Sequence, residues 1–159
     1  MERTLVLVKP DGIQRGLVGE IMTRFERKGL KLLALKMTQL SDELLDKWYE
    51  HHKDKDFFVE LKNFMKWTPV VAMVWEGQRG VEVVRRIVGV TKGFEAESGS
   101  IRGDFGLSGS QNIVHASDSV EAATKEIGLL FEDDEIFYTY ESAIECLIYG
   151  NQERAKKED

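Results

Sequence analysis

Hydrophobic residues follow two patterns that alternate along the chain. Short runs rich in valine, isoleucine and leucine are typical of buried strands, and they occupy residues 4–8, 30–40, 70–75 and 113–116. Between these runs, apolar residues return every three or four positions, as in amphipathic helices. This helical spacing extends over residues 17–28, 41–49, 57–65, 81–88 and 120–131. We therefore expect four strands interleaved with helices.

Turn-forming and capping residues mark where several elements end or begin. The sequence Pro-Asp-Gly at 10–12 ends the first strand at a turn and leaves Lys9 at the strand's end. Ser41 has the side chain of an N-cap residue at the start of the second helix. Asp118 and Glu121 have the spacing of a capping box, so we expect them to open the last helix.

The segment after residue 88 shows neither pattern for about twenty residues, which is long for a loop in a compact domain. It is rich in glycine, at positions 93, 99, 103, 106 and 109. Loops of this length are usually functional or mobile. We therefore expect this segment to be one or the other.

The order of elements predicts the fold class. Four strands interleaved with helices indicate an α/β sandwich, here a ferredoxin-like four-stranded antiparallel sheet with helices packed on one of its faces. No internal repeat interrupts this order. We expect one domain over residues 1–150, followed by a charged, flexible tail at 151–159.

Composition and charge exclude several classes of function. The chain is 42% hydrophobic and 31% charged, as in globular proteins, and it has no apolar run long enough to span a bilayer. Its start lacks the basic flank and cleavage site of a signal peptide, so we expect a cytoplasmic protein. A net charge of −6 argues against binding to nucleic acid. The single cysteine, Cys146, lies in an apolar stretch and is expected in the core.

The strongest candidate for chemistry is His115, in the sequence Asn-Ile-Val-His-Ala-Ser-Asp-Ser at 112–119. It lies on a short strand between the glycine-rich segment and the last helix. A neutral imidazole is a competent nucleophile near pH 7, and a phosphorylated histidine passes its phosphoryl group on. Its other ring nitrogen needs a partner, for which Glu121 and Glu126 are candidates, with Glu126 deeper in the helix. A lone histidine on an apolar strand is more often structural, so its neighbours decide.

Several donors could bind a polyphosphate in this otherwise acidic protein. They are Lys9, Arg85, Thr91, Arg102 and Asn112. Each basic residue taken singly is more often a solvated surface group. The chain contains no Gly-Lys-Ser or Gly-Lys-Thr, which excludes a P-loop. Side chains would therefore bind the phosphates, with magnesium bridging phosphate oxygens.

Four segments in the same order resemble the nucleoside diphosphate kinases. They are Lys-Pro-Asp-Gly at 9–12, Pro-Val-Val-Ala-Met-Val-Trp-Glu-Gly at 69–77, Ile-Arg-Gly-Asp-Phe at 101–105, and the histidine segment at 112–119. The resemblance covers residues 2 to about 149. It implies transfer of the γ-phosphoryl group of a nucleoside triphosphate, typically ATP, to a nucleoside diphosphate. The implied mechanism is ping-pong, through a phosphohistidine at His115.

The resemblance also implies roles for individual residues. Glu126 would bond the far ring nitrogen of His115, and Ser117 would steady Glu126. Phe57, with Leu61 beside it, would stack on the nucleotide base. Phosphates and sugar hydroxyls would be bound by Lys9, Tyr49, Arg85, Thr91, Arg102 and Asn112. Magnesium would be bound through the nucleotide phosphates, so no metal site on the protein is expected. The adjacent His51 and His52 are expected to be exposed rather than ligands.

The chain departs from the family pattern at four positions. Lys92 and Ser98 stand where many members have prolines in the long loop, and Asp56 replaces a common proline before Phe57. Gly109 lies where some relatives place an apolar residue against the base. Relatives form homo-oligomers, so we expect a hexamer, with a tetramer as the alternative, and neither membrane nor nucleic-acid partners.

Two other functions remain open from the sequence. A regulatory module of the same fold would bind nucleotides without turnover, because a fold does not determine a function. A phosphorelay protein would pass the phosphoryl group of His115 to a side chain of a partner. The first predicts binding without phosphohistidine, and the second predicts poor transfer to free diphosphates.

Overall fold

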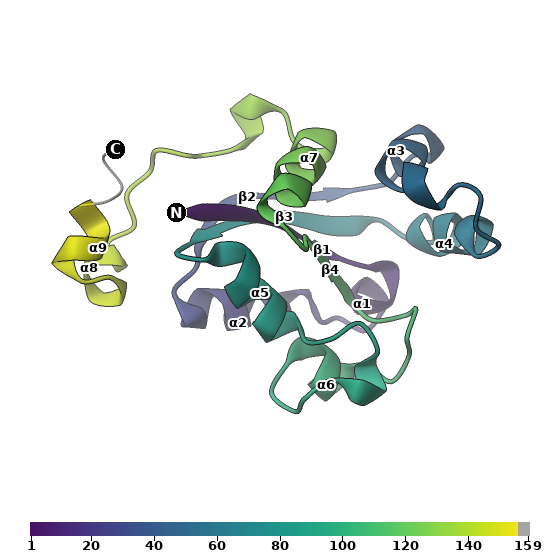
Figure 1. The fold of residues 1–159 in the computed structure, drawn as a ribbon, viewed down its shortest axis with the longest axis horizontal. Coiled ribbons are helices and arrows are strands. Elements are labelled where there is room, and N and C mark those ends of the chain that lie inside the picture. The colour runs from purple at the N-terminus through teal and green to yellow at the C-terminus, as the bar shows by residue number, and fades with distance from the viewer. Residues whose placement is uncertain (156–159) are drawn as a thin grey trace.

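A four-stranded antiparallel sheet forms the centre of the molecule in the computed structural model, which describes residues 1–155 (Figure 1). Its strands are β1 (Glu2–Val8), β2 (Lys31–Thr38), β3 (Val70–Gly77) and β4 (Val114–Ala116), in the spatial order β2-β3-β1-β4. β1 lies between β3 and β4 and pairs antiparallel with both. The predicted ferredoxin-like α/β fold with a four-stranded antiparallel sheet is confirmed.

The five predicted helices are all present. They are α2 (Val18–Lys28), α3 (Asp42–Trp48), α4 (Phe58–Met65), α5 (Gly80–Val88) and α7 (Val120–Leu130). Four shorter α-helices are α1 (Pro10–Gln14), α6 (Ile101–Phe105), α8 (Glu145–Ile148) and α9 (Asn151–Ala155). Single 3₁₀ turns lie at η1 (Glu50–His52), η2 (Gly93–Glu95) and η3 (Asp133–Glu135). The turn expected after β1 is thus helical, and the segment without a pattern contains η2 and α6.

Helices cover both faces of the sheet, so the expectation of helices on one face was wrong. Leu5 and Leu7 of β1 pack in one core cluster with residues of α3, α4 and α7, whereas Val6 and Val8 pack in a second with residues of α2 and α5. Figure 1 shows α2 and α5 on one side of the sheet and α3 and α7 on the other. A strand buried on both faces has apolar residues at successive positions, which is what β1 and β3 show.

Two further expectations were wrong. Ser119, and not Asp118, caps α7, because its hydroxyl accepts a 3.0 Å hydrogen bond from the amide of Ala122. Both side chains can cap a helix, and the sequence does not show where the chain turns. Cys146 is exposed rather than buried, because α8 is short and lies at the margin of the molecule. Of the expected tail, residues 151–155 form α9, and residues 156–159 lie outside the described part of the chain.

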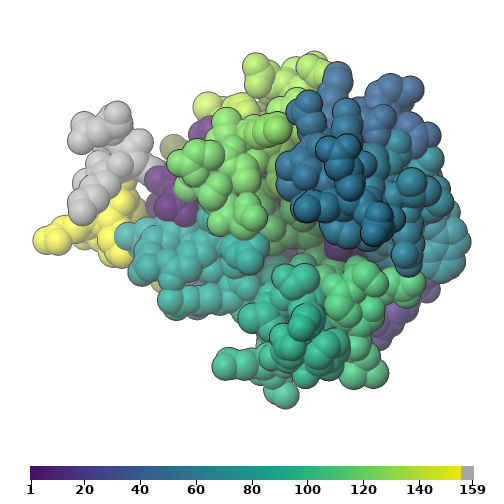
Figure 2. Space-filling model, turned by 45° about the vertical axis from the view of Figure 1, so that its right-hand side comes forward, coloured from purple at the N-terminus to yellow at the C-terminus, as the bar shows by residue number. Residues whose placement is uncertain are grey.

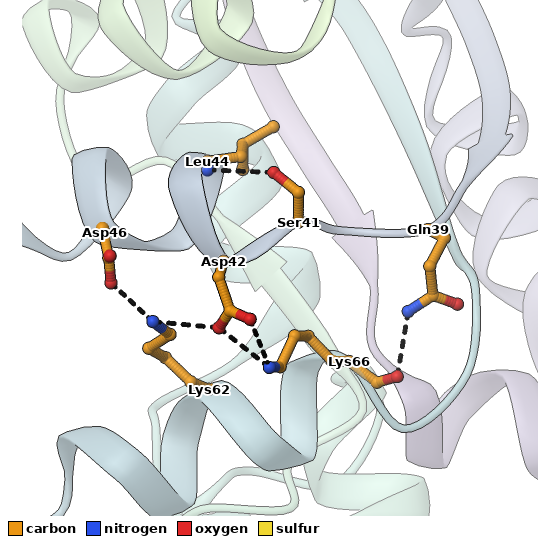
Figure 3. Close-up of polar contacts among 7 residues, drawn as sticks. All are labelled: Gln39, Ser41, Asp42, Leu44, Asp46, Lys62 and Lys66. Atoms are coloured by element: carbon orange, nitrogen blue, oxygen red, sulfur yellow. Dashed lines mark hydrogen bonds and ion pairs between the residues drawn. The ribbon is translucent and has the colours of Figure 1, made fainter.

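Ion pairs join α3 to α4 (Figure 3). The ammonium group of Lys62 lies 2.6 Å from a carboxylate oxygen of Asp46 and 2.9 Å from one of Asp42. Lys66, one turn further along α4, lies 2.8 Å from Asp42. Lysines from one helix thus bind aspartates of the other. α3 and α4 therefore form a helical hairpin whose two helices are joined by ion pairs.

The entry to this hairpin is fixed by uncharged contacts (Figure 3). The Ser41 hydroxyl accepts a 3.2 Å hydrogen bond from the amide of Leu44 and caps α3 as predicted. Gln39 donates a 2.9 Å hydrogen bond to the carbonyl of Lys66 at the end of α4. The segment that enters the hairpin is therefore bonded to the segment that leaves it.

The ion pairs of the hairpin predict an acid-dependent loss of stability. Hydrogen bonds from Lys66 and Lys62 hold the pKa of Asp42 below its ordinary value of 3.8. A carboxylate with a lowered pKa stabilises the fold fully above its ordinary pKa, and this contribution is lost as the pH falls through the lowered value. We expect Asp42→Asn to melt at a lower temperature than the unaltered protein at pH 6, and the difference to shrink below pH 3.8. A difference in melting temperature that stays constant down to pH 2 would show that the ion pairs of Asp42 do not stabilise the fold.

Candidate active site

His115 lies at the middle of β4, opposite Leu7 of β1. Its neighbours Val114 and Ala116 are buried against the face covered by α2 and α5. Because side chains alternate along a strand, His115 points to the opposite face, toward α3 and α7. Its side chain is 21% exposed, so it is held by the protein and still reachable.

A strained turn precedes His115. Ile113 is fully buried and has a φ of 74°, a conformation that β-branched residues rarely adopt. Its amide donates to Asp11 at 2.9 Å, and its carbonyl accepts from the amide of Lys9 at 2.8 Å. A side-chain carbon on Gly12 would approach that carbonyl to 2.8 Å, so only glycine fits there. The first turn of α1 therefore holds the strand that carries the histidine.

Glu126 and Ser117 fix one edge of the imidazole. Nε2 of His115 lies 3.0 Å from Oε1 of Glu126, and the Ser117 hydroxyl donates to Oε2 of Glu126 at 2.5 Å. Ser117 is itself fully buried and accepts from the amide of Leu5 at 3.2 Å. Of the two glutamates considered, Glu126 thus meets the histidine, and Glu121 is exposed on the first turn of α7. Nδ1 of His115 has no hydrogen-bond partner within residues 1–155.

Trp48, at the end of α3, also belongs to this cluster, and sequence reasoning missed it. Its indole N–H donates to Oε1 of Glu126 at 3.0 Å. The indole also meets the imidazole of His115 edge to face, with ring centroids 5.2 Å apart. The helical spacing of residues 41–49 indicates only that Trp48 lies on the apolar side of this helix. The available signal was its N–H group, because a buried indole usually finds an acceptor.

Hydrogen bonds keep Glu126 ionised despite its burial. Burial alone raises the pKa of this carboxyl, but the hydrogen bonds from His115, Ser117 and Trp48 together lower it below its ordinary value. Glu126 is therefore a carboxylate at neutral pH. A carboxylate accepts hydrogen bonds only, so the nitrogen of His115 that faces it carries a proton.

A group of buried polar residues lies at the other end of β4. Lys9 is 9% exposed, and its ammonium donates to Oδ1 of Asn112 at 2.7 Å. The side-chain amide of Asn112 donates in turn, through Nδ2, to the backbone carbonyl of Thr91 at 2.9 Å. Burial and the nearby Arg102 lower the pKa of Lys9 to about 8, although Asp11 opposes the shift. Among residues 1–155 no carboxylate is hydrogen-bonded to the ammonium group of Lys9, so this buried cation is suited to bind an anion.

Arg102 connects this group to the glycine-rich segment. Its guanidinium donates to three backbone carbonyls, those of Val114 at 2.6 Å, Gly89 at 3.0 Å and Asn112 at 3.2 Å. A guanidinium has five N–H groups, so two remain for another acceptor. Burial and the neighbouring charge of Arg85 lower the pKa of Arg102 to about 10, so it stays charged at neutral pH.

The remaining candidates lie on the outer parts of the same region. Phe57 is 49% exposed and Leu61 is half-buried, both on the α3–α4 hairpin. Tyr49 is stacked on Trp48 with ring centroids 5.5 Å apart. Arg85 and Thr91 are exposed. Figure 2 shows the hairpin (blue) and the segment that carries α6 (teal-green) on one face, with the surface hollowed between them.

The adjacent histidines belong to the base of the hairpin. His51 is exposed as expected, whereas His52 is half-buried beside the rings of Tyr49 and Phe57. Among residues 1–155, no group of three or more histidine, cysteine or acidic side chains is arranged to bind a metal. A hollow of about 1150 Å³ beside α5 borders Arg85 and none of the other candidates.

Residues 2–136 match the family model described as nucleoside diphosphate kinase. The chain belongs to the nucleoside diphosphate kinase family. Among relatives with that name, the protein of Staphylothermus marinus is 58% identical over 135 residues, covering 85% of this chain and 96% of its own. That of Archaeoglobus fulgidus is 53% identical over 149 residues, covering 94% and 98%.

Solved structures of the nucleoside diphosphate kinase family superpose on most of the chain. The family protein of Babesia bovis is 46% identical, with a TM-score of 0.90, and the match covers 94% of this chain and all of that one. A halophilic nucleoside diphosphate kinase of Halobacterium salinarum, solved with CDP, is 43% identical with a TM-score of 0.90, covering 94% and 99%. The predicted family and enzyme class, a phosphotransferase, are therefore confirmed.

The buried lysine of this nucleoside diphosphate kinase fold predicts a stability that rises in alkali. The pKa of Lys9 is about 8 in the folded chain and 10.5 ordinarily, so between these values the unfolded state binds one proton more. Stability rises with pH wherever the unfolded state binds more protons, by about 1.4 kcal/mol for each pKa unit of difference. We expect the unaltered protein to gain stability relative to Lys9→Met as the pH rises from 8 to 10.5. Urea unfolding measures the free energy of unfolding of both proteins at each pH. A difference between them that stays constant from pH 8 to 10.5 would show that Lys9 has an ordinary pKa.

Proposed function

We propose that His115 carries the phosphoryl group in this chain, through its Nδ1 atom. The observation that carries the proposal is the 3.0 Å contact between Nε2 and Glu126, which leaves Nδ1 without a partner within residues 1–155. An imidazole that is protonated on Nε2 has its lone pair on Nδ1. Nδ1 is thus the ring nitrogen left to attack, on an imidazole that Glu126 orients and whose side chain is 21% exposed.

The reaction takes place in two halves. The lone pair of Nδ1 attacks the γ-phosphorus of a nucleoside triphosphate, typically ATP, and the bond from that phosphorus to the β,γ-bridging oxygen breaks. The diphosphate leaves with the electron pair, and the positive charge that develops on the ring is stabilised by Glu126 through Nε2–H. An oxygen of the terminal phosphate of a second nucleoside diphosphate then attacks this phosphorus. The bond from phosphorus to Nδ1 breaks, its electron pair returns to Nδ1, and a nucleoside triphosphate leaves.

Cationic side chains would bind the phosphates at the end of β4. Lys9 and Arg102 are buried there in a chain of net charge −6, and they are the groups whose pKa values burial lowers most plainly. An arriving phosphate would pair with both cations, whose charge Asp11 offsets only in part. Arg85 and Thr91 would bind from the outer side, and Asn112, already bonded to Lys9, would orient the ammonium.

Magnesium would reach the site on the nucleotide. The described residues contain no cluster of ligands for it, whereas the basic group at β4 fits its anionic carrier. When bound, the ion neutralises charge on the phosphate oxygens. The residues of the chain position the phosphates and the nucleophile, which is the larger part of catalysis in phosphoryl transfer.

The hairpin would bind the nucleoside. Phe57 offers a half-exposed ring on which a base can stack, with Leu61 beside it, and the buried hydroxyl of Tyr49 lies near the carboxylate of Glu126. Stacking uses a face that every base has, so it accepts all bases. The relative from Halobacterium salinarum was solved with CDP, which supports a nucleotide site in this fold.

We further propose a cytoplasmic homo-oligomer, with a hexamer favoured over a tetramer. Large apolar side chains are exposed on the edge strand β2, where Leu35 is 48% and Met37 61% exposed. Exposed apolar side chains on an edge strand favour contact with another subunit. No helix among residues 1–155 has the length and hydrophobicity to cross a bilayer. Light scattering measures the number of subunits.

The test is transfer through a phosphorylated intermediate. After brief incubation with ATP and magnesium and removal of nucleotide, we expect one acid-labile phosphoryl group per chain, which disappears on addition of GDP as GTP forms. His115→Ala should lose both signals and at least about 1000-fold in turnover, as expected when a nucleophile is removed. His51→Ala, an exposed histidine outside the cluster, is the matched control and should retain both.

Intact-mass analysis distinguishes the alternatives. Binding of ATP without a gain in mass would leave a regulatory nucleotide-binding module. A gain in mass that GDP does not remove would leave a phosphorelay protein. Appreciable turnover in His115→Ala would contradict the proposed mechanism.

A further inference from the structure

Trp48 makes a contact that has no part in the roles proposed above for His115, for Glu126 and for the residues that bind phosphate. It is the last residue of α3 and is 5% exposed. Its indole N–H points to Oε1 of Glu126 at 3.0 Å, the same oxygen that faces Nε2 of His115. A hydrogen bond to an ionised acceptor is about twice as strong as one between neutral groups. The contact is therefore more than packing.

We propose that Trp48 is a positioning residue for phosphoryl transfer, which holds the carboxylate of Glu126 through its N–H and the ring of His115 through its edge. This role rests on the proposed function of His115. Trp48 acts through Glu126 and His115 and makes no bond to the reacting phosphorus.

The geometry shows why a second fixed donor is useful. The terminal torsion of a glutamate side chain is soft, so a single hydrogen bond leaves the carboxylate free to turn. Here Ser117 donates to Oε2 from the strand side, and Trp48 donates to Oε1 from α3. Donors on both oxygens, from two separate elements, fix the plane of the carboxylate. One acceptor direction on Oε1 then remains for His115, which gives the imidazole one orientation.

The indole also restricts rotation of the His115 ring by direct contact. The two ring planes meet at 89° with centroids 5.2 Å apart, so the imidazole lies edge to face against a buried and rigid side chain. A turn of the imidazole that exchanged its two nitrogens would break the bond to Glu126. Trp48 therefore favours the arrangement in which Nδ1 stays directed away from Glu126.

The other two tryptophans of the chain have different surroundings and serve as internal references. Trp67 is 61% exposed. The indole nitrogen of Trp75 is buried without a hydrogen-bond partner within residues 1–155. Of the three tryptophans, Trp48 alone donates to a carboxylate in the described part of the chain. Its N–H is thus distinguishable by spectroscopy.

The kinetic test removes the N–H and keeps an aromatic ring. In Trp48→Phe we expect the rate of phosphohistidine formation at saturating ATP and magnesium to fall about 10-fold, the loss that one hydrogen bond to a charged group represents. The dissociation constant for ATP should change less than about 2-fold, because orientation and not binding is affected. Trp48→His restores a ring N–H and should recover most of the rate. Trp67→Phe is the matched control and should react as the unaltered protein does.

Three kinetic outcomes separate the claims. Equal rates in the unaltered protein, Trp48→Phe and Trp48→His would overturn the role of Trp48 and leave the proposed function intact. The role would also be overturned if Trp48→His formed phosphohistidine as slowly as Trp48→Phe, because restoring the N–H donor should restore the orientation of Glu126. Absence of phosphohistidine in the unaltered protein would overturn the proposed function and this role together.

An NMR measurement decides the contact even where a tryptophan variant does not fold. In the unaltered protein, the indole proton of Trp48 should resonate downfield of those of Trp67 and Trp75, because it faces a carboxylate. Glu126→Gln removes that charge and should move the Trp48 signal upfield while the other two stay in place. A Trp48 signal that does not respond to Glu126→Gln would overturn the proposal.

Discussion

The hydrogen bond between Glu126 and Nε2 of His115 is the contact on which the rest of the site depends. It joins β4 to α7, and it is possible because β4 pairs with β1 and α7 packs against β1. Donors offset the burial of the carboxylate, so that it remains charged and holds the imidazole in one tautomer. Ser117 and Trp48 supply two of those donors, from the strand and from α3. The histidine is therefore oriented by a carboxylate of α7 that is itself held from α3 and from the residue that follows β4.

A second constraint holds β4 from its other end. Ile113 occupies a left-handed backbone conformation, which persists because Asp11 and Lys9 bond its amide and carbonyl. Arg102 joins the glycine-rich segment to the same strand through the carbonyls of Asn112 and Val114, and to the end of α5 through that of Gly89. The cations that would bind phosphate are thus also the groups that hold the strand of the nucleophile. Binding and positioning depend on the same side chains.

The sequence predicted what depends on periodicity and missed what depends on short or tertiary features. All four strands and five helices follow from apolar spacing, whereas α1 and α6 have five residues each and are too short to show it. The unbroken apolar run of β1 already indicates that helices cover both faces of the sheet. Exposure of Cys146 was not, because an apolar stretch does not show whether a core is near. Glu126 was recoverable from its depth in α7, but the bond from Trp48 depends on how α3 meets α7.

The measurement that tests this account most directly is the identification of the phosphorylated ring nitrogen by ¹⁵N and ³¹P NMR of the intact phosphoprotein. The bond to Glu126 occupies Nε2 of His115, and Nδ1 is the nitrogen that we propose as the nucleophile. We therefore predict a phosphorus bonded to Nδ1, with the proton on Nε2 still donated to Glu126. A phosphorus bonded to Nε2 would contradict it, because that atom is occupied in the structure.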